Sequence, residues 1–168
     1  MAKITIDKLT EWYQTCGPEL RLYALQWHGE QVAEDVVQDA FIQLLKMRRC
    51  PDRVRPWLFR VVRNGAVTRL RQEQTRKKAR DRFPQIHGWW FEAHPDEGLD
   101  ARQAQAVLQT LPAECREIVV MRIWGQLSFR EIADIIEKSI PWVHRQYKTA
   151  LGRIKQGLEA SSCRTRHA

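Results

Sequence analysis

The sequence lacks the features that mark membrane-spanning, secreted and zinc-binding proteins. No apolar run approaches the roughly 20 residues that a membrane-spanning helix needs. Residues 1–13 contain no uninterrupted apolar segment of the kind found in a signal peptide, so we expect a cytoplasmic protein. The cysteines are widely scattered and form no C-x-x-C pair, which predicts reduced thiols and no zinc site; they are Cys16, Cys50, Cys115 and Cys163.

The sequence also lacks the residue patterns of catalysis. It has no nucleophile–base pair, no metal-ligand spacing and no glycine-rich phosphate loop. We expect its histidines to be surface residues or hydrogen-bonded residues rather than ligands: His28, His87, His94, His144 and His167. The sequence therefore predicts a protein that is not an enzyme and that uses no cofactor or metal.

Positive charge, in contrast, is abundant and concentrated. The net charge is +8, which favours an acidic partner, with nucleic acid as the first candidate. Residues 48–82 contain thirteen basic and three acidic residues, so this segment alone carries +10. A run of like charges is usually a solvated face. Concentration on one helix and its flanks instead favours a surface that follows a phosphate backbone.

Apolar residues recur at helical spacing in two blocks, and no strand pattern or internal repeat is present. The sequence predicts an all-α fold with a first domain at 1–75, a linker at 76–98, a second domain at 99–158 and a tail at 159–168. The linker contains Trp89-Trp90-Phe91, a cluster too apolar for a flexible linker that makes no contacts. We expect this cluster to pack on one of the domains or on a partner.

Three helical segments are expected in the first block. Residues 4–27 predict two helices broken near Gly17-Pro18. Residues 31–47 form the clearest amphipathic pattern, and Pro56 suits the first turn of a helix over about 56–71. The polar face of the 31–47 helix is largely acidic, which by itself is also typical of an ordinary solvated face.

In the second block, Leu127–Lys155 predicts a helix-turn-helix. Ser128 and Glu131 have the spacing of a capping box, and Ser139 can cap a second helix that tolerates Pro141 in its first turn. No acidic residue occurs between Ser139 and Lys155, so the outer face of this second helix is basic. The pattern favours a DNA-reading helix, with a plain helical hairpin as the alternative.

Taken together, three segments in this order resemble an extracytoplasmic-function (ECF, group 4) sigma factor of the sigma-70 family. They are AEDVVQDAFIQLLK (33–46), RPWLFRVVRNGAVTRLR (55–71) and LPAECREIVVMRIWGQLSFREIADII (111–136), the last continuing into the helix from Ile140. The resemblance implies a sigma region 2-like domain followed by a region 4-like helix-turn-helix domain. It implies bacterial core RNA polymerase and promoter DNA as partners. An anti-sigma factor becomes a candidate partner too, because in this family such a protein often holds the two domains.

The resemblance also implies roles for particular residues. Those implied for binding core polymerase are Asp35, Gln38 and Asp39. Those implied for reading and opening the minus-ten element are Arg60, Arg63, Asn64 and Arg71, with Asn64 helping to hold a base flipped from the non-template strand. Those implied for the minus-thirty-five element are His144, Arg145, Lys148 and Thr149.

The sequence departs from the family pattern at several positions. Glu137 stands where a glycine is usual in the turn, which is costly if the backbone there has positive φ. Trp142 replaces a small residue early in the recognition helix, and Thr68 replaces an Asp or Asn. Gly65 lies inside the promoter-opening helix, at a cost of about 1 kcal/mol relative to alanine.

Three functions are compatible with these patterns. A sigma factor binds polymerase first and has little specific DNA affinity alone. A stand-alone helix-turn-helix regulator binds duplex DNA tightly by itself, usually as a dimer. A polymerase-binding adaptor without promoter recognition is suggested by Glu137 and Trp142. The acidic helix and the single recognition helix favour the sigma factor.

Overall fold

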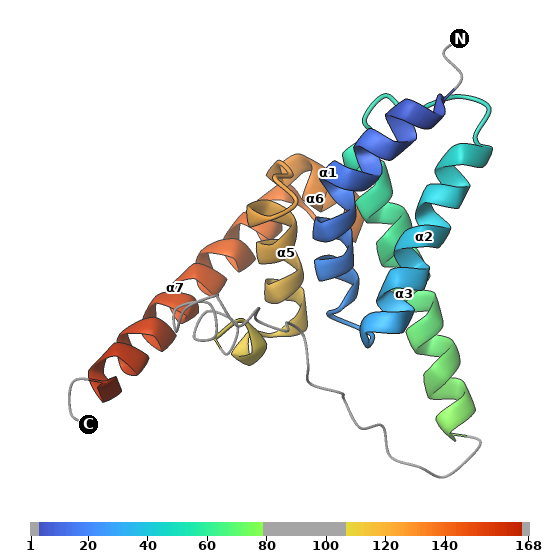
Figure 1. Ribbon diagram of the computed structural model, residues 1–168. Coiled ribbons are helices and arrows are strands. Elements are labelled where there is room, and N and C mark those ends of the chain that lie inside the picture. The colour runs from blue at the N-terminus through green and yellow to red at the C-terminus, as the bar shows by residue number, and fades with distance from the viewer. Residues whose placement is uncertain (1–3, 79–106, 166–168) are drawn as a thin grey trace. The chain divides into compact units, whose positions relative to one another are not determined.

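The computed structural model describes residues 4–78 and 107–165 (Figure 1). These residues form helices and no strand, in agreement with the predicted all-α fold. The chain divides into two compact units, residues 1–89 and 90–168, which are described separately below. The predicted linker lies almost wholly outside the described residues, and Trp89-Trp90-Phe91 lies outside them entirely.

The described part of the first unit, residues 4–78, forms three helices, coloured blue to green in Figure 1: α1 (Ile6–Ala24), α2 (Glu30–Lys46) and α3 (Val54–Lys78). Each helix contacts the other two. The centre of the core is aromatic, since the buried ring of Tyr23 lies 5.0 Å from that of Trp27 and 5.1 Å from that of Phe59. Aliphatic side chains complete the core, among them Leu20, Val37, Leu44, Leu58 and Val62.

The predicted break at Gly17-Pro18 is wrong, because α1 is a single helix with Pro18 inside it. A proline in a helix interior removes one hydrogen bond and costs about 3 kcal/mol. Here the proline is exposed, and the residues that follow it are buried against α2 and α3. Burial of Leu20, Tyr23 and Ala24 keeps the second half of α1 in line, so tertiary packing outweighs the local preference.

Gly65 of α3 lies against Val36 of α2. A Cβ atom built at Gly65 would lie 3.3 Å from Cγ1 of Val36, which is tighter than an ordinary van der Waals contact. The unfavourable glycine noted in the sequence therefore has a packing reason. The connection before α2 is also fixed to α3, because Nε2 of buried His28 lies 2.7 Å from the carbonyl oxygen of Ala66.

The second unit contains a helical segment at 107–110 followed by α5 (Ala113–Ile123), α6 (Phe129–Ile136) and α7 (Ile140–Thr165). Helices α5, α6 and α7 contact one another in every pairing. Their shared core is aliphatic and includes Ile118, Met121, Leu127, Ile132, Val143 and Ala150. Helix α7 has 26 residues and runs past 158, so the residues predicted as a tail begin within a helix.

Candidate nucleic-acid interface

Helices α6 and α7 begin with the caps that the sequence predicts. The Glu131 backbone N–H donates to Oγ of Ser128 over 3.3 Å, and the Ser128 backbone N–H donates to the Glu131 carboxylate over 2.8 Å, which completes the capping box. The backbone N–H of Trp142 donates to Oγ of Ser139 over 3.4 Å, as expected for a cap on α7. The starts of both helices are therefore fixed by side chains close in sequence.

Glu137 adopts the backbone conformation for which glycine is usual. Its φ is 58° and its ψ is 45°, in the left-handed region. The next N–H, that of Lys138, donates to the carbonyl oxygen of Ala133 over 3.1 Å, as in a Schellman ending. The helix-turn-helix geometry is thus kept despite the glutamate, at the cost of local strain.

The four residues predicted to read the minus-thirty-five element differ in their surroundings. Arg145, Lys148 and Thr149 are exposed on α7. His144 is half-buried, and its ring packs edge-to-face on Phe129 of α6 with 5.2 Å between centroids. Three exposed polar side chains on a basic helix can contact base edges and phosphates, whereas His144 is held by the aromatic neighbour.

Phe129 is a site residue that sequence reasoning missed. Its ring also contacts Tyr147 of α7, at 5.3 Å, and the guanidinium of Arg122 lies 4.8 Å from its centroid. Phe129 therefore joins α5, α6 and α7 beneath the basic face. The sequence feature that could have indicated this role is the position of Phe129 directly after the N-cap Ser128, from which an aromatic side chain can reach α7.

Trp142 has a partner that the sequence did not reveal. The ammonium group of Lys138 lies 5.5 Å from the centroid of the Trp142 ring, in cation–π range. Trp142, which replaces a small residue of the family pattern, is thus in contact with a basic side chain of the preceding turn. The half-buried Trp142 ring and the exposed Lys138 form one feature at the start of α7.

In the first unit, the residues predicted to bind polymerase lie on one face of α2 but are already engaged within the protein. Arg69 of α3 lies between Asp35 and Asp39, with its NH2 2.5 Å from Oδ2 of Asp39 and its NH1 3.8 Å from Oδ2 of Asp35. Gln38 donates to the carboxylate of Glu34 over 3.2 Å. Arg69 was not among the predicted site residues, because its pairing depends on the register between α2 and α3.

Helix α1 contacts the acidic residues at the N-terminal end of α2. The hydroxyl of Tyr13 donates to Glu34 over 2.9 Å, and this hydrogen bond is the main cause that raises the pKa of Tyr13. Arg21 forms ion pairs with Glu30 and with Glu34. The acidic face is therefore oriented from both sides, by α1 and by α3.

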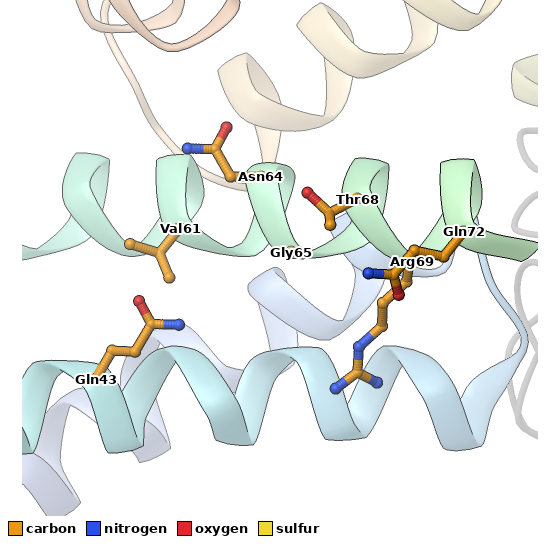
Figure 2. A pocket seen from close by; sticks show the side chains of 7 residues that line it. All are labelled: Gln43, Val61, Asn64, Gly65, Thr68, Arg69 and Gln72. Atoms are coloured by element: carbon orange, nitrogen blue, oxygen red, sulfur yellow. The ribbon is translucent and has the colours of Figure 1, made fainter.

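A groove of about 400 Å³ separates part of α2 from α3 (Figure 2). Gln43 contributes the α2 side, and the α3 side is formed by Val61, Asn64, Gly65, Thr68, Arg69 and Gln72. Figure 2 shows Asn64 pointing away from α2, whereas Arg69 reaches across to α2. Gly65 has no side chain, so it contributes only backbone to the groove wall.

The other predicted minus-ten residues extend from this groove along α3. Positions 60, 64 and 71 are four and seven residues apart, so Arg60 and Arg71 share a helical face with Asn64. Both arginines are exposed, whereas Arg63 is half-buried and lies beside that face. The arrangement offers amide groups for a base and guanidinium groups for phosphates.

The described residues contain no candidate metal site. No group of three or more His, Cys, Asp or Glu side chains among them could hold one. Cys16, Cys50 and Cys115 are free thiols, and burial raises the pKa of Cys115. Within 4–78 and 107–165, no helix is long and apolar enough to cross a bilayer.

Comparison with known families decides the identity of these two units. Residues 12–76 match Sigma-70 region 2, and residues 101–154 match Sigma-70, region 4. The chain belongs to the sigma-70 family. The two matches together cover more than two thirds of the sequence, in the order that the resemblance implied. This sigma-70 protein is therefore a factor for promoter-specific transcription initiation.

The relatives of this sigma-70 protein include an ECF sigma factor. The ECF RNA polymerase sigma factor SigM of Bacillus subtilis (strain 168) is 23% identical over 163 residues, covering 94% of each chain. The fold is similar to that of the sigma factor RpoE solved with the anti-sigma factor NepR from Bartonella quintana: the TM-score is 0.76 at 21% identity, over 92% of this chain and 98% of that one. CnrH, solved with the cytosolic domain of CnrY, gives 0.62 at 24% identity, over 93% and 90%.

Proposed function

We propose that this ECF protein binds core RNA polymerase through α2, opens the minus-ten element along α3 and reads the minus-thirty-five element with α7. The observation that carries the proposal is the pairing of an open, amide-lined groove in the first unit with a capped, basic helix-turn-helix in the second. Polymerase performs the chemistry in this proposal, and the protein itself needs no catalytic group.

Asp35, Gln38 and Asp39 are proposed as the polymerase-docking residues. They lie on one face of α2, and the side chains of Asp35 and Asp39 are 48% and 56% exposed, so a basic partner can reach them. Ion pairing with such a partner provides both orientation and an increased association rate.

Promoter opening is proposed for the exposed side of α3. An unpaired base of the non-template strand would enter the groove beside Asn64, whose amide can donate to and accept from a base edge. Arg60, Arg63 and Arg71 would neutralise the phosphates on either side. Thr68, in place of the usual Asp or Asn, contributes an uncharged hydroxyl to this wall of the groove.

Duplex recognition is proposed for α7. Arg145, Lys148 and Thr149 would face the major groove and the backbone, and His144 would be positioned through Phe129. The intact turn at Glu137 supports promoter reading over an adaptor that has lost it. The single recognition helix per chain supports an initiation factor over a dimeric stand-alone regulator.

An anti-sigma factor is proposed as a further partner, and the cytoplasm as the location, because polymerase is found there. RpoE and CnrH were each solved with a partner, the anti-sigma factor NepR and the cytosolic domain of CnrY respectively. The Trp89-Trp90-Phe91 cluster remains the proposed docking point from the sequence. If substitution of both tryptophans left every partner interaction unchanged, this assignment would be wrong.

Run-off transcription tests the proposed function directly. Purified bacterial core polymerase is incubated with genomic fragments, including the region upstream of this gene, with and without the protein. Discrete transcripts that require the protein support the proposal, and their aligned start sites give both promoter elements. Core binding without transcripts would favour the adaptor. Tight duplex binding without any polymerase association would favour the stand-alone regulator.

A further inference from the structure

Arg69 belongs to two surfaces at once. Its guanidinium pairs with Asp35 and Asp39 on α2, and its side chain lines the groove that also contains Asn64 and Thr68 (Figure 2). The side chain is 32% exposed, so it is neither buried in the core nor free in solvent. One cation therefore stands between the proposed polymerase-docking residues and the proposed site of the unpaired strand.

The two surfaces compete for this cation. A basic group of polymerase that approaches Asp35 and Asp39 must share or replace Arg69 as their counter-ion. An unpaired strand that enters the groove brings phosphates, for which a guanidinium is a strong bidentate ligand. Arginine has a long side chain with planar donors, so a change of rotamer can move the guanidinium from α2 toward the groove without movement of the helix.

We propose that Arg69 is a shared counter-ion that couples polymerase docking to strand capture. In the free protein it neutralises Asp35 and Asp39. When basic residues of polymerase take over the two carboxylates, the guanidinium turns into the groove and binds the non-template strand. This inference rests on the proposed function and adds a residue and an order of events to it.

The coupling through Arg69 predicts the direction and the size of changes in two binding affinities. In the free protein, Arg69 lowers the affinity for polymerase and reduces the positive charge available to DNA. Exposed ion pairs are weak, so we expect effects of about two- to fivefold on each affinity. Because coupling between two binding sites is reciprocal, a single strand in the groove should strengthen polymerase binding by the factor with which polymerase strengthens strand binding.

Three variants of the full chain test the proposal: Arg69→Gln, Arg69→Lys and Arg76→Gln. Arg76 is exposed two turns further along α3, so its variant removes the same charge from the same helix. Affinity for core polymerase and affinity of the holoenzyme for a single-stranded non-template oligonucleotide are measured separately. Thermal unfolding of each variant checks that the first unit is folded.

We expect Arg69→Gln to bind polymerase about two- to fivefold more tightly, and its holoenzyme to bind the oligonucleotide two- to fivefold more weakly. Arg69→Lys keeps the charge and should stay within about twofold of the wild type in both measurements. Arg76→Gln should weaken oligonucleotide binding without a gain in polymerase affinity. If Arg69→Gln instead bound polymerase equally or more weakly, Arg69 would be a structural brace and the proposal would be wrong.

A mutant cycle in a background that carries both Asp35→Asn and Asp39→Asn locates the effect. In that background, Arg69→Gln should give at most a small gain in polymerase affinity, because both ion pairs have already been broken. A gain of unchanged size would overturn the proposal, since it would not arise from these two pairs. If the wild type bound no polymerase at all, the proposed function itself would fail, which is a different result from any change caused by Arg69.

Discussion

At the scale of single residues, Glu137 and Gly65 are both unusual for their positions. Glu137 adopts a backbone conformation in which glycine is usual, and Gly65 is a glycine inside a helix, where most other residues are favoured. Glu137 has a left-handed backbone, φ 58°, at the end of α6, where a negative side chain also meets the negative end of the helix dipole. Gly65 faces Val36 across the contact between α2 and α3. The effect of a substitution at either position on the free energy of unfolding can therefore be predicted.

Glu137→Gly should stabilise the second unit by about 0.5–1 kcal/mol. The substitution relieves left-handed strain and removes an unfavourable charge, partly offset by the greater entropy of glycine in the unfolded chain. Chemical denaturation of the full chain, followed by a probe in the second unit, measures the change. Lys138→Gly is the control, because Lys138 does not have a positive φ, and it should lower stability.

Gly65→Ala should bring no net gain in stability, although alanine is favoured over glycine in helices by about 1 kcal/mol. The new methyl group would meet Val36 at 3.3 Å and offset the gain. Gly152→Ala is the matched control, since nothing lies within 4 Å of its Cβ position in α7, and it should show the full gain. Equal gains in the two variants would mean that α2 and α3 are not tightly packed at this point.

At the scale of helices, the sequence predicts best where the signal is local. The caps at Ser128 and Ser139 each depend on a few neighbouring residues, and both are found. The break at Pro18 was wrong because burial of the following residues overrides the local cost. The pairing of Arg69 with Asp39 was missed because it requires the register of two helices, which no local pattern specifies.

Ser128→Ala should destabilise the second unit by about 1 kcal/mol, because it removes the acceptor for the Glu131 backbone N–H. The loss should appear in thermal unfolding of the second unit and should weaken reading of the minus-thirty-five element. Affinity for core polymerase through α2 should be unchanged. Ser139→Ala serves as a comparison, since its hydrogen bond to Trp142 is longer, at 3.4 Å, and its loss should cost less.

At the scale of the whole molecule, the two units carry different parts of one activity. The first contains the acidic face of α2 and the groove beside α3, and the second contains the basic face of α7. The family assignment could be made from sequence because three segments occur in a fixed order. The internal partners of the proposed binding residues could not, because Arg69, Phe129 and Lys138 act through contacts between elements or across a turn.

This division predicts that the two proposed DNA contacts can be separated. Arg145→Ala with Lys148→Ala should reduce run-off transcription from a duplex promoter by at least about tenfold, since one good base contact is worth about 1–3 kcal/mol. The same variant should bind core polymerase normally and should regain most activity on a template whose minus-ten region is already unpaired, because the first unit can then engage the open strand. Asn64→Ala provides the opposite case: it should remain impaired on the pre-opened template, because its proposed contact is with the unpaired base itself. If both variants responded alike to the open template, the groove and α7 would not have the separate roles assigned to them.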